Sequence, residues 1–244
     1  MTPGLAAWAA AAVLAAGTPG PSYRVAPAAA TRDALLAGDT KAWAPAERVR
    51  WGPPRYSTEF AALWDAEALY LRFAATDPQP WHTMTNRDDH LWEEEVVEIF
   101  LDPARSGRDY FELEISPANV VCDVRMIQPS PDKKIDLTWN FEGLETRVVP
   151  SAPGHAKGWT ALARLLWSGF RSLPSAAGLA LPPRGADRWR FNLFRVDRPG
   201  GKAKPEENAV EAAWSPTGQP SFHVPAAFRD FVFADAPAAP PRRR

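Results

Sequence analysis

Residues 96–101 read Val-Val-Glu-Ile-Phe-Leu, and residues 110–115 read Tyr-Phe-Glu-Leu-Glu-Ile. In both stretches apolar side chains recur at every second position, which places the following on one face: Val97, Ile99, Leu101, Phe111, Leu113 and Ile115. Successive side chains of a β-strand point to opposite faces of a sheet. The period of two therefore predicts two strands, each with one face directed toward a core.

The same period recurs along the chain. Segments 59–64 and 68–75 are typical of a hairpin closed by the turn 65–67. Further strands are expected at 120–127, 145–149, 159–166, 189–197, 210–214 and 231–234, and a short helix near 166–173. This spacing predicts an all-β fold, a two-sheet antiparallel β-sandwich of the jelly-roll or immunoglobulin-like kind. It would have about nine to ten strands and at most one or two short helices.

The composition narrows the class of partner. The chain of 244 residues has 26 prolines, 11 tryptophans and 12 phenylalanines, which favours short strands joined by stiff loops. Its formal net charge is −1, so it has no global positive field to attract nucleic acid or an anionic membrane. Cys122 is the single cysteine, so no intramolecular disulfide can form, and its valine neighbours favour a buried side chain.

The two ends of the chain differ in composition from its middle. Residues 1–22, with an apolar, alanine-rich run, are assigned to a signal peptide, although a cut after the alanines at 28–30 is an alternative. The run is too short for a transmembrane segment, so a secreted or periplasmic protein is expected. Residues 23–31 are then a linker, 32–234 one β-sandwich domain, and 235–244 a disordered Ala/Pro/Arg tail.

Several ordered motifs resemble the family 9 carbohydrate-binding modules, which belong to a DOMON-like superfamily of β-sandwiches. The motifs are Leu63-Trp64-Asp65, Asn86-Arg87-Asp88-Asp89, the stretch 92–103, the stretch 110–115, Gly158-Trp159-Thr160, Trp189-Arg190-Phe191-Asn192 and Trp214-Ser215-Pro216-Thr217-Gly218. Their order along the chain is more specific than any one of them. The resemblance implies a β-sandwich that binds sugar.

The resemblance also implies a set of ligand contacts. In the family two aromatic side chains enclose a sugar ring, and their positions fall on Trp92 and Phe222, although well-studied modules have Trp at the second. An acidic group and an amide that bond sugar hydroxyls fall on Glu98 and Gln219. A basic contact of the family falls on the strand where this chain has Glu114, so that part of the site differs.

The residue chemistry agrees with part of this assignment. A sugar needs a flat aromatic face for its C–H patch and polar groups for its hydroxyls. Trp92 is a tryptophan between charged residues, which favours a ligand platform or a lid over the core. Asn86, Arg87 and His223 are further polar candidates beside the groups named above. In contrast, Trp64, Trp159 and Trp189 lie in alternating strands and are expected in the core.

A structural calcium ion is the one cofactor that the sequence leaves open. Some family members bind calcium, and four aspartates could supply oxygen ligands here: Asp88, Asp89, Asp102 and Asp109. They lack EF-hand spacing. The four histidines are scattered and show no metal-binding spacing.

These observations favour non-catalytic binding of an oligo- or polysaccharide, in extracellular or periplasmic polysaccharide breakdown, in association with carbohydrate-active enzymes. No catalytic residue is assigned. The alternative is a glycoside hydrolase in which Glu98 acts with Glu112 or Glu114. A third class is a haem-binding DOMON-like domain, for which Met84, Met126 and His223 would be the candidate ligands.

Overall fold

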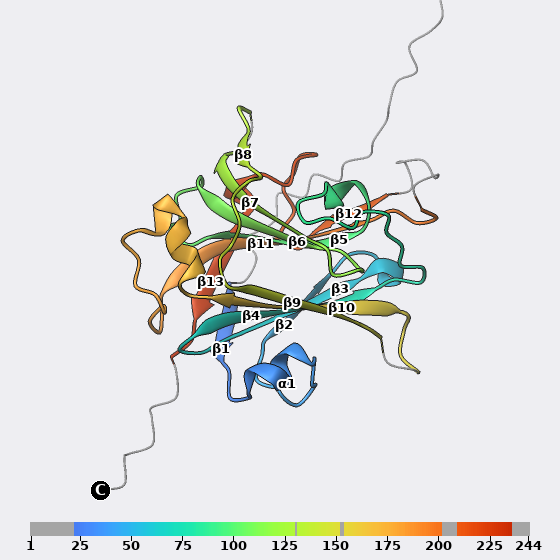
Figure 1. Ribbon diagram of the computed structural model, residues 1–244, viewed down its shortest axis with the longest axis horizontal. Coiled ribbons are helices and arrows are strands. Elements are labelled where there is room, and N and C mark those ends of the chain that lie inside the picture. Colours follow the sequence, from blue (N-terminus) through green and yellow to red (C-terminus); the bar gives the residue numbers. More distant parts are fainter. Residues whose placement is uncertain (1–21, 130, 152–153, 202–208, 236–244) are drawn as a thin grey trace, which may run out of the picture.

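The computed structural model describes residues 22–129, 131–151, 154–201 and 209–235. Within them the chain forms two layers of β-strands (Figure 1). We call the upper layer of that view sheet A and the lower layer sheet B. No helix in these ranges is long and apolar enough to cross a membrane.

Sheet A carries the two stretches quoted above. Its strands follow the order β8-β7-β6-β5-β11-β13, and β12 pairs with the C-terminal half of β11, residues 194–197. Their bounds are β5 (Val96–Asp102), β6 (Tyr110–Ile115), β7 (Val121–Gln128), β8 (Lys134–Asp136), β11 (Arg188–Asp197), β12 (Val210–Ala213) and β13 (Arg229–Phe233).

Sheet B is built on the predicted hairpin of β3 (Thr58–Trp64) and β4 (Ala68–Thr76). β4 pairs next with β10 (Gly158–Leu166), and β10 with β9 (Leu144–Pro150). The other edge of β3 pairs with β2 (Arg48–Trp51) along its first half.

The strand β1 (Tyr23–Pro27) joins the two sheets. Its residues 23–25 pair with β13 in sheet A, and its residues 26–27 pair with β3 in sheet B, in both cases in parallel. Tyr23 is fully buried; its hydroxyl donates to Glu47 O at 2.6 Å and accepts from Ala62 N at 2.7 Å. The first described strand is therefore part of both layers.

The all-β fold is confirmed, and all ten predicted strands are present. The described residues form 13 strands rather than nine to ten, because β1, β2 and β8 are added. The expected linker 23–31 is wrong, since it contains β1. The expected signal peptide and C-terminal tail lie outside the described residues, except for Ser22 and Asp235.

Helical structure is short throughout the described ranges. One α-helix, α1 (Arg32–Leu36), was not predicted, and Thr31 caps its start by accepting from Ala34 N. The helix expected near 166–173 is the 3-10 turn η3 (Gly169–Ser172). The other 3-10 turns are η1 (Pro54–Tyr56), η2 (Leu91–Glu93), η4 (Pro174–Ala176) and η6 (Pro225–Ala227).

The core lies between the sheets and is rich in aromatic rings. Phe60 of sheet B packs within reach of Tyr23 and of Phe191 in sheet A, with ring centroids 5.3 Å and 6.3 Å away. The faces predicted from alternation meet there, including Val97, Ile99, Leu101, Leu69, Leu71 and Phe73. Trp64, Trp159 and Trp189 are buried in the same core, as expected.

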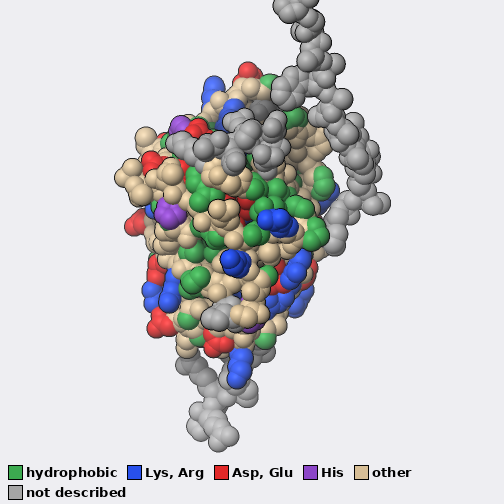
Figure 2. Space-filling view, turned by 90° about the vertical axis from the view of Figure 1, so that its right-hand side faces the viewer, with side chains coloured by type: hydrophobic (Ala, Val, Ile, Leu, Met, Phe, Trp, Pro, Cys, Tyr) green, Lys and Arg blue, Asp and Glu red, His purple; other side chains and the backbone are tan. Residues whose placement is uncertain are grey.

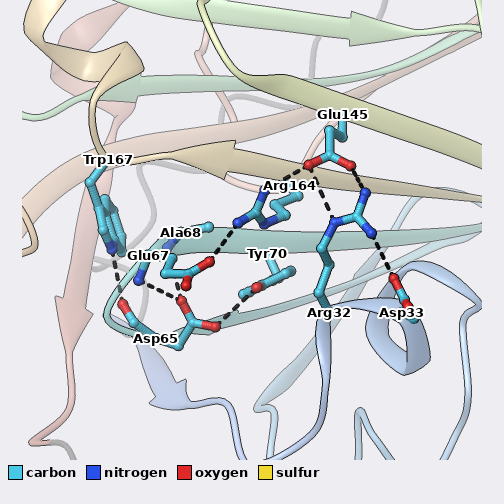
Figure 3. Close-up of polar contacts among 9 residues, drawn as sticks. All are labelled: Arg32, Asp33, Asp65, Glu67, Ala68, Tyr70, Glu145, Arg164 and Trp167. Carbon is cyan, nitrogen blue, oxygen red and sulfur yellow. Dashed lines mark hydrogen bonds and ion pairs between the residues drawn. The ribbon is translucent and has the colours of Figure 1, made fainter.

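The outer face of sheet B is closed by α1 and the turns after it. Leu35 and Trp43 pack there against Leu63, Tyr70 and Leu162. A polar network surrounds this patch (Figure 3): Arg32 and Arg164 both bond Glu145, and Arg164 reaches Glu67 at 2.9 Å. This face is therefore covered by the chain itself.

The outer face of sheet A is covered differently. Its outward residues form two buried clusters, one around Val96 and Val124 and one around Phe100 and Phe194. Loops, rather than a helix, lie over them and contribute the partly exposed Trp92 and Phe222. Figure 2 shows the right-hand side of the view in Figure 1, where both layers are seen from the side, and there apolar side chains gather in the middle with Lys or Arg side chains among them.

Candidate functional site

A pocket of about 220 Å³ opens on the outer face of sheet A. β5, β6, β7 and β11 each contribute a side chain to it, so its base is a rigid sheet. Its walls come from η2 and from the segment 220–223. Pockets that combine a rigid base with loop walls are typical ligand sites.

Three glutamates line this pocket and are all buried. Glu98 of β5 lies directly opposite Glu114 of β6, and Glu112 is two residues away on the same face of β6. One carboxylate oxygen from each of the three lies within 4.8 Å of the others. The strand period explains the grouping, because positions 98, 112 and 114 alternate with the core residues of their strands.

Burial changes the protonation of these groups. Removal from water raises the pKa of Glu112 to about 7, and it raises the pKa of Glu98 and Glu114 well above the usual value. Repulsion among the neighbouring carboxylates raises the pKa of Glu98 and Glu114 further. The pocket thus holds protons that a ligand with donors or positive charge could replace.

Aromatic rings form the apolar part of the pocket. Trp92 stacks on His90 with a centroid distance of 4.4 Å, and Phe222 stacks on Phe194 at 4.3 Å. Each ring thereby has one face supported by a neighbouring ring. Phe100 lines the same pocket and stacks on His223 at 4.9 Å.

His223 is held as a neutral residue. Its Nδ1 forms a 3.1 Å hydrogen bond with the Tyr110 hydroxyl, and burial lowers the pKa of the imidazole to about 3. It can therefore donate or accept a single hydrogen bond without bringing charge to the pocket.

The loop before β5 is anchored by two acidic residues. Glu94 accepts from Thr83 N at 2.8 Å and Met84 N at 3.2 Å, and Glu95 accepts from Trp81 N at 3.1 Å. Both glutamates are buried, although they belong to a run of three acidic residues, 93–95. Their bonds fix the loop that carries Trp92.

A second carboxylate group lies beneath that loop. Asp77, Glu95 and Asp197 bring oxygens within 4.8 Å of one another, a spacing that suits one cation. The protein supplies that cation itself, because Arg195 Nη2 bonds Asp77 at 3.1 Å and also bonds Asp197. The Arg195 guanidinium also lies over the Trp159 ring, 5.1 Å from its centroid.

The structure brings together three of the six ligand residues predicted from the sequence. Trp92, Glu98 and Phe222 all line the pocket. Gln219 is exposed next to the lining residue Pro220, so it lies at the rim. We therefore keep these four as proposed contacts.

Asn86 and Arg87 do not line the pocket. Arg87 is tied to Asn140 and to the buried Asp123 of β7. Asn86 is exposed, and its backbone N–H donates to Asp89 at 2.8 Å. These two residues stabilise the loop, and the sequence assignment of ligand contact to them is not supported by their position.

The four aspartates named as calcium candidates do not converge on one point, and local hydrogen bonds hold two of them in place. Asp102 accepts from Ser106 N and Gly107 N, and Asp109 bonds Arg125 Nε at 2.5 Å. In the described ranges they form no group of three within reach of a single ion.

Haem ligation also finds no common site. His223 lines the pocket, but Met126 is buried beside Phe100 and Met84 packs near Leu91, both outside the lining.

Other lining residues are not singled out by any sequence motif. Glu112, Glu114 and Phe100 were visible as outward positions of alternating strands, but alternation alone does not show that a cavity lies over them. Lys133, Arg198 and Glu211 come from segments with no motif, and only the fold places them beside the pocket.

Comparisons with known proteins agree with this architecture. Residues 38–145 match the family described as carbohydrate family 9 binding domain-like. A protein of Arthroderma benhamiae named "Extracellular protein" is 26% identical over 185 residues, covering 74% of this chain and 80% of the relative.

Two solved structures have a similar fold. A family 9 carbohydrate-binding module from Caldicellulosiruptor kristjanssonii, in complex with cellotriose, aligns with a TM-score of 0.62 at 15% identity and covers 92% of this chain and 100% of the module. A structure of such a module from the same organism with glucose aligns with a TM-score of 0.58 at 15% identity, covering 89% and 99%. Residues 38–145 are therefore similar to the carbohydrate family 9 binding domain-like family, and the described fold is similar to that of the family 9 modules.

Proposed function

We propose that the chain binds carbohydrate, without cleaving it, in the outer-face pocket of sheet A. The observation that carries this proposal is the pairing of aromatic rings with buried acceptors in one cavity. Trp92 and Phe222 offer flat apolar faces, and Glu98 offers a carboxylate shielded from water. A sugar ring presents C–H patches on its faces and hydroxyls at its rim, which match these two kinds of group.

The modules with a similar fold support the ligand class. Their structures contain cellotriose and glucose, which are neutral sugars with many hydroxyls. A buried carboxyl group can accept hydrogen bonds and, when protonated, can also donate one, so Glu98 would orient sugar hydroxyls. Gln219 at the rim would add an amide contact.

The carboxylates themselves favour binding over hydrolysis. A retaining glycosidase needs one ionised nucleophile and one protonated acid on opposite sides of the scissile bond. Here the three glutamates stand together on one surface, and burial raises the pKa of each. Carboxyls on one surface do not place an acid and a nucleophile on opposite sides of a glycosidic bond.

We further propose that the protein acts outside the cytoplasm, secreted or periplasmic, in polysaccharide breakdown. The alanine-rich start of the sequence and the name of the fungal relative support export. Association with carbohydrate-active enzymes would follow from a binding protein that lacks catalysis.

Calorimetric titration with cellotriose, xylotriose and chitotriose tests the function. Trp92→Ala should weaken binding by about 2–4 kcal/mol, roughly 30- to 1000-fold, as for buried aromatic anchors. Phe222→Ala should cost less, about 1–2 kcal/mol, because a phenyl ring covers less of a sugar. Phe222→Trp should keep or increase affinity.

Trp139→Ala is the matched control, since Trp139 is also a partly buried indole packed on an apolar cluster but lies outside the pocket. It should leave affinity unchanged. If Trp92→Ala binds as tightly as Trp139→Ala, the site is elsewhere. Release of reducing sugar that disappears in Glu98→Gln would contradict the non-catalytic assignment.

A further inference from the structure

The base of the pocket concentrates carboxyl groups that have no paired cation among the described residues. Glu98 and Glu114 are directly opposed on neighbouring strands, an arrangement that is destabilising for like charges. Glu112 adds a third carboxyl within 4.8 Å. No described residue forms an ion pair with any of the three.

Two of these carboxyls also lack a full set of hydrogen bonds. Glu98 is 2% exposed and its Oε1 has no partner; Glu114 is 1% exposed and its Oε2 has none, among the residues that the structure describes. Both residues line the pocket. A buried carboxyl oxygen without a donor costs free energy, so a donor from a ligand would relieve that cost.

The same protein shows how such a group is neutralised elsewhere. Asp77 and Asp197 stand as close together as the pocket glutamates, and the fully buried Arg195 bonds both. Of these two carboxyl groups of the described residues, the glutamate group lines a cavity and has no paired cation. The missing positive charge would therefore come from the ligand.

The two cationic side chains that line the pocket, Arg198 and Lys133, do not pair with the three glutamates. Arg198 lines the pocket but is occupied, since it pairs with Glu211 at 3.7 Å and donates to Trp92 O at 3.3 Å. Lys133 is exposed and lies beyond ion-pair distance of the three glutamates. The lining as a whole has four carboxyl groups against two cations.

The size and lining of the pocket distinguish between kinds of cation. Its volume of about 220 Å³ is several times the roughly 30 Å³ share of one water molecule, so a bare ion would leave most of it unfilled. Trp92, Phe100 and Phe222 add ring faces, which attract both sugar C–H groups and an ammonium. An ammonium also has three donors for three carboxyls.

We propose that this pocket prefers a sugar bearing an ammonium group, a 2-amino-2-deoxyhexose unit of a de-N-acetylated polysaccharide, with its ammonium placed between Glu98, Glu112 and Glu114. The preference rests on the carbohydrate binding proposed above and specifies its substrate class. It arises because the ammonium replaces protons that the crowded carboxyls otherwise hold.

Three trisaccharides that differ mainly at carbon 2 test the preference: β-1,4-linked glucosamine trimer, its N-acetylated form and cellotriose. Titration at about pH 6 and low salt should give at least tenfold tighter binding for the glucosamine trimer. Added NaCl should reduce this ratio because it screens charge. All titrations are run with chelator and repeated with Ca²⁺.

Glu114→Gln keeps the shape of the side chain and removes its charge. It should reduce the ratio to about threefold or less. Glu112→Gln provides a second test if Glu114→Gln does not fold, and thermal melts identify that case. The control Glu142→Gln, an exposed carboxyl outside the pocket, should keep the full ratio.

The outcomes separate the two proposals. Equal binding of glucosamine trimer and cellotriose overturns the ammonium preference and leaves carbohydrate binding standing. Cellotriose binding that requires Ca²⁺ and is lost in Glu114→Gln overturns it in favour of a metal ion. Failure of all three trisaccharides, together with the sugars named above, overturns the proposed function itself.

Discussion

Glu112 is a pocket residue that lowers the stability of the ligand-free protein. It is buried beside Glu98 and Glu114 with no internal cation, and burial raises its pKa to about 7. Sites that bind ligands commonly contain groups whose environment is unfavourable until the ligand arrives. The ligand-free protein should therefore gain stability when this charge is removed.

The pH dependence of stability tests this directly. The folded protein holds the Glu112 proton more tightly than the unfolded chain, whose carboxyl titrates near 4.5. The stabilisation from this group is thus complete below about pH 4.5 and is lost as the pH rises to about 7. Glu112→Gln should make the fall in unfolding free energy between pH 5 and 8 smaller, by about 1–3 kcal/mol.

Urea unfolding at both pH values measures the effect. His223 acts in the opposite direction, because burial lowers its pKa to about 3 and its stabilisation is lost as the pH falls below about 6.5. Glu142→Gln should reproduce the wild-type difference. A wild-type protein equally stable at pH 5 and 8, with no change in Glu112→Gln, would contradict the prediction.

At the scale of elements, alternation located ten strands because each has one face in a core that excludes polar residues. Alternation did not predict the strands that form because of pairing with an adjacent strand. β2 reads Arg-Val-Arg-Trp, and three of its four residues are partly or fully exposed, so it has little apolar signal. β8 spans only Lys134–Asp136.

The sequence also cannot show which outward faces of a sheet lie under loops. For this reason the pocket residues Lys133 and Glu211 were not predicted.

The β3–β4 hairpin shows how one side chain can define a turn. Asp65 Oδ1 accepts from Glu67 N at 2.8 Å and Ala68 N at 2.9 Å, while its Oδ2 accepts from the Tyr70 hydroxyl at 2.9 Å (Figure 3). Trp167 Nε1 donates to the Asp65 carbonyl at 2.9 Å. The turn therefore links β3, β4 and the end of β10.

Asp65→Ala should destabilise the protein by about 1–3 kcal/mol, because the side chain satisfies two backbone N–H groups and one hydroxyl. Tyr70→Phe removes only one of these bonds and should cost less, about 0.5–1.5 kcal/mol. Chemical denaturation of both variants gives the comparison. An Asp65→Ala variant no less stable than Tyr70→Phe would show that the backbone alone defines the turn.

At the scale of the whole molecule, β1 is the strand that belongs to both sheets. In the sequence it resembles a linker, because five residues beside an alanine-rich run are too short a pattern to identify a strand. Its parallel pairs with β13 and β3 depend on residues far along the chain. Such long-range pairing has no local signal.

Truncation tests how much β1 contributes to the stability of the fold. A chain that begins at Ser22 should fold, whereas one that begins at Thr31 should show no cooperative melt, because it lacks Tyr23 and the pairs with both sheets. Circular dichroism during heating measures the difference. The same result would place any export cut before residue 23 and exclude the alternative cut after residues 28–30. A stable protein beginning at Thr31 would show that the sheets hold together without β1.

The pairing of β1 also affects the order in which the protein can be completed during its synthesis. Tyr23 is among the first described residues to be made, yet its partner Phe231 is among the last. Contacts so distant in sequence form slowly, since a long loop must close first. A nascent chain therefore cannot complete the β1–β13 pairing, and with it sheet A, before β13 has left the ribosome. A chain bound for export would still be open, and threadable through a translocation channel, for nearly the whole of its synthesis.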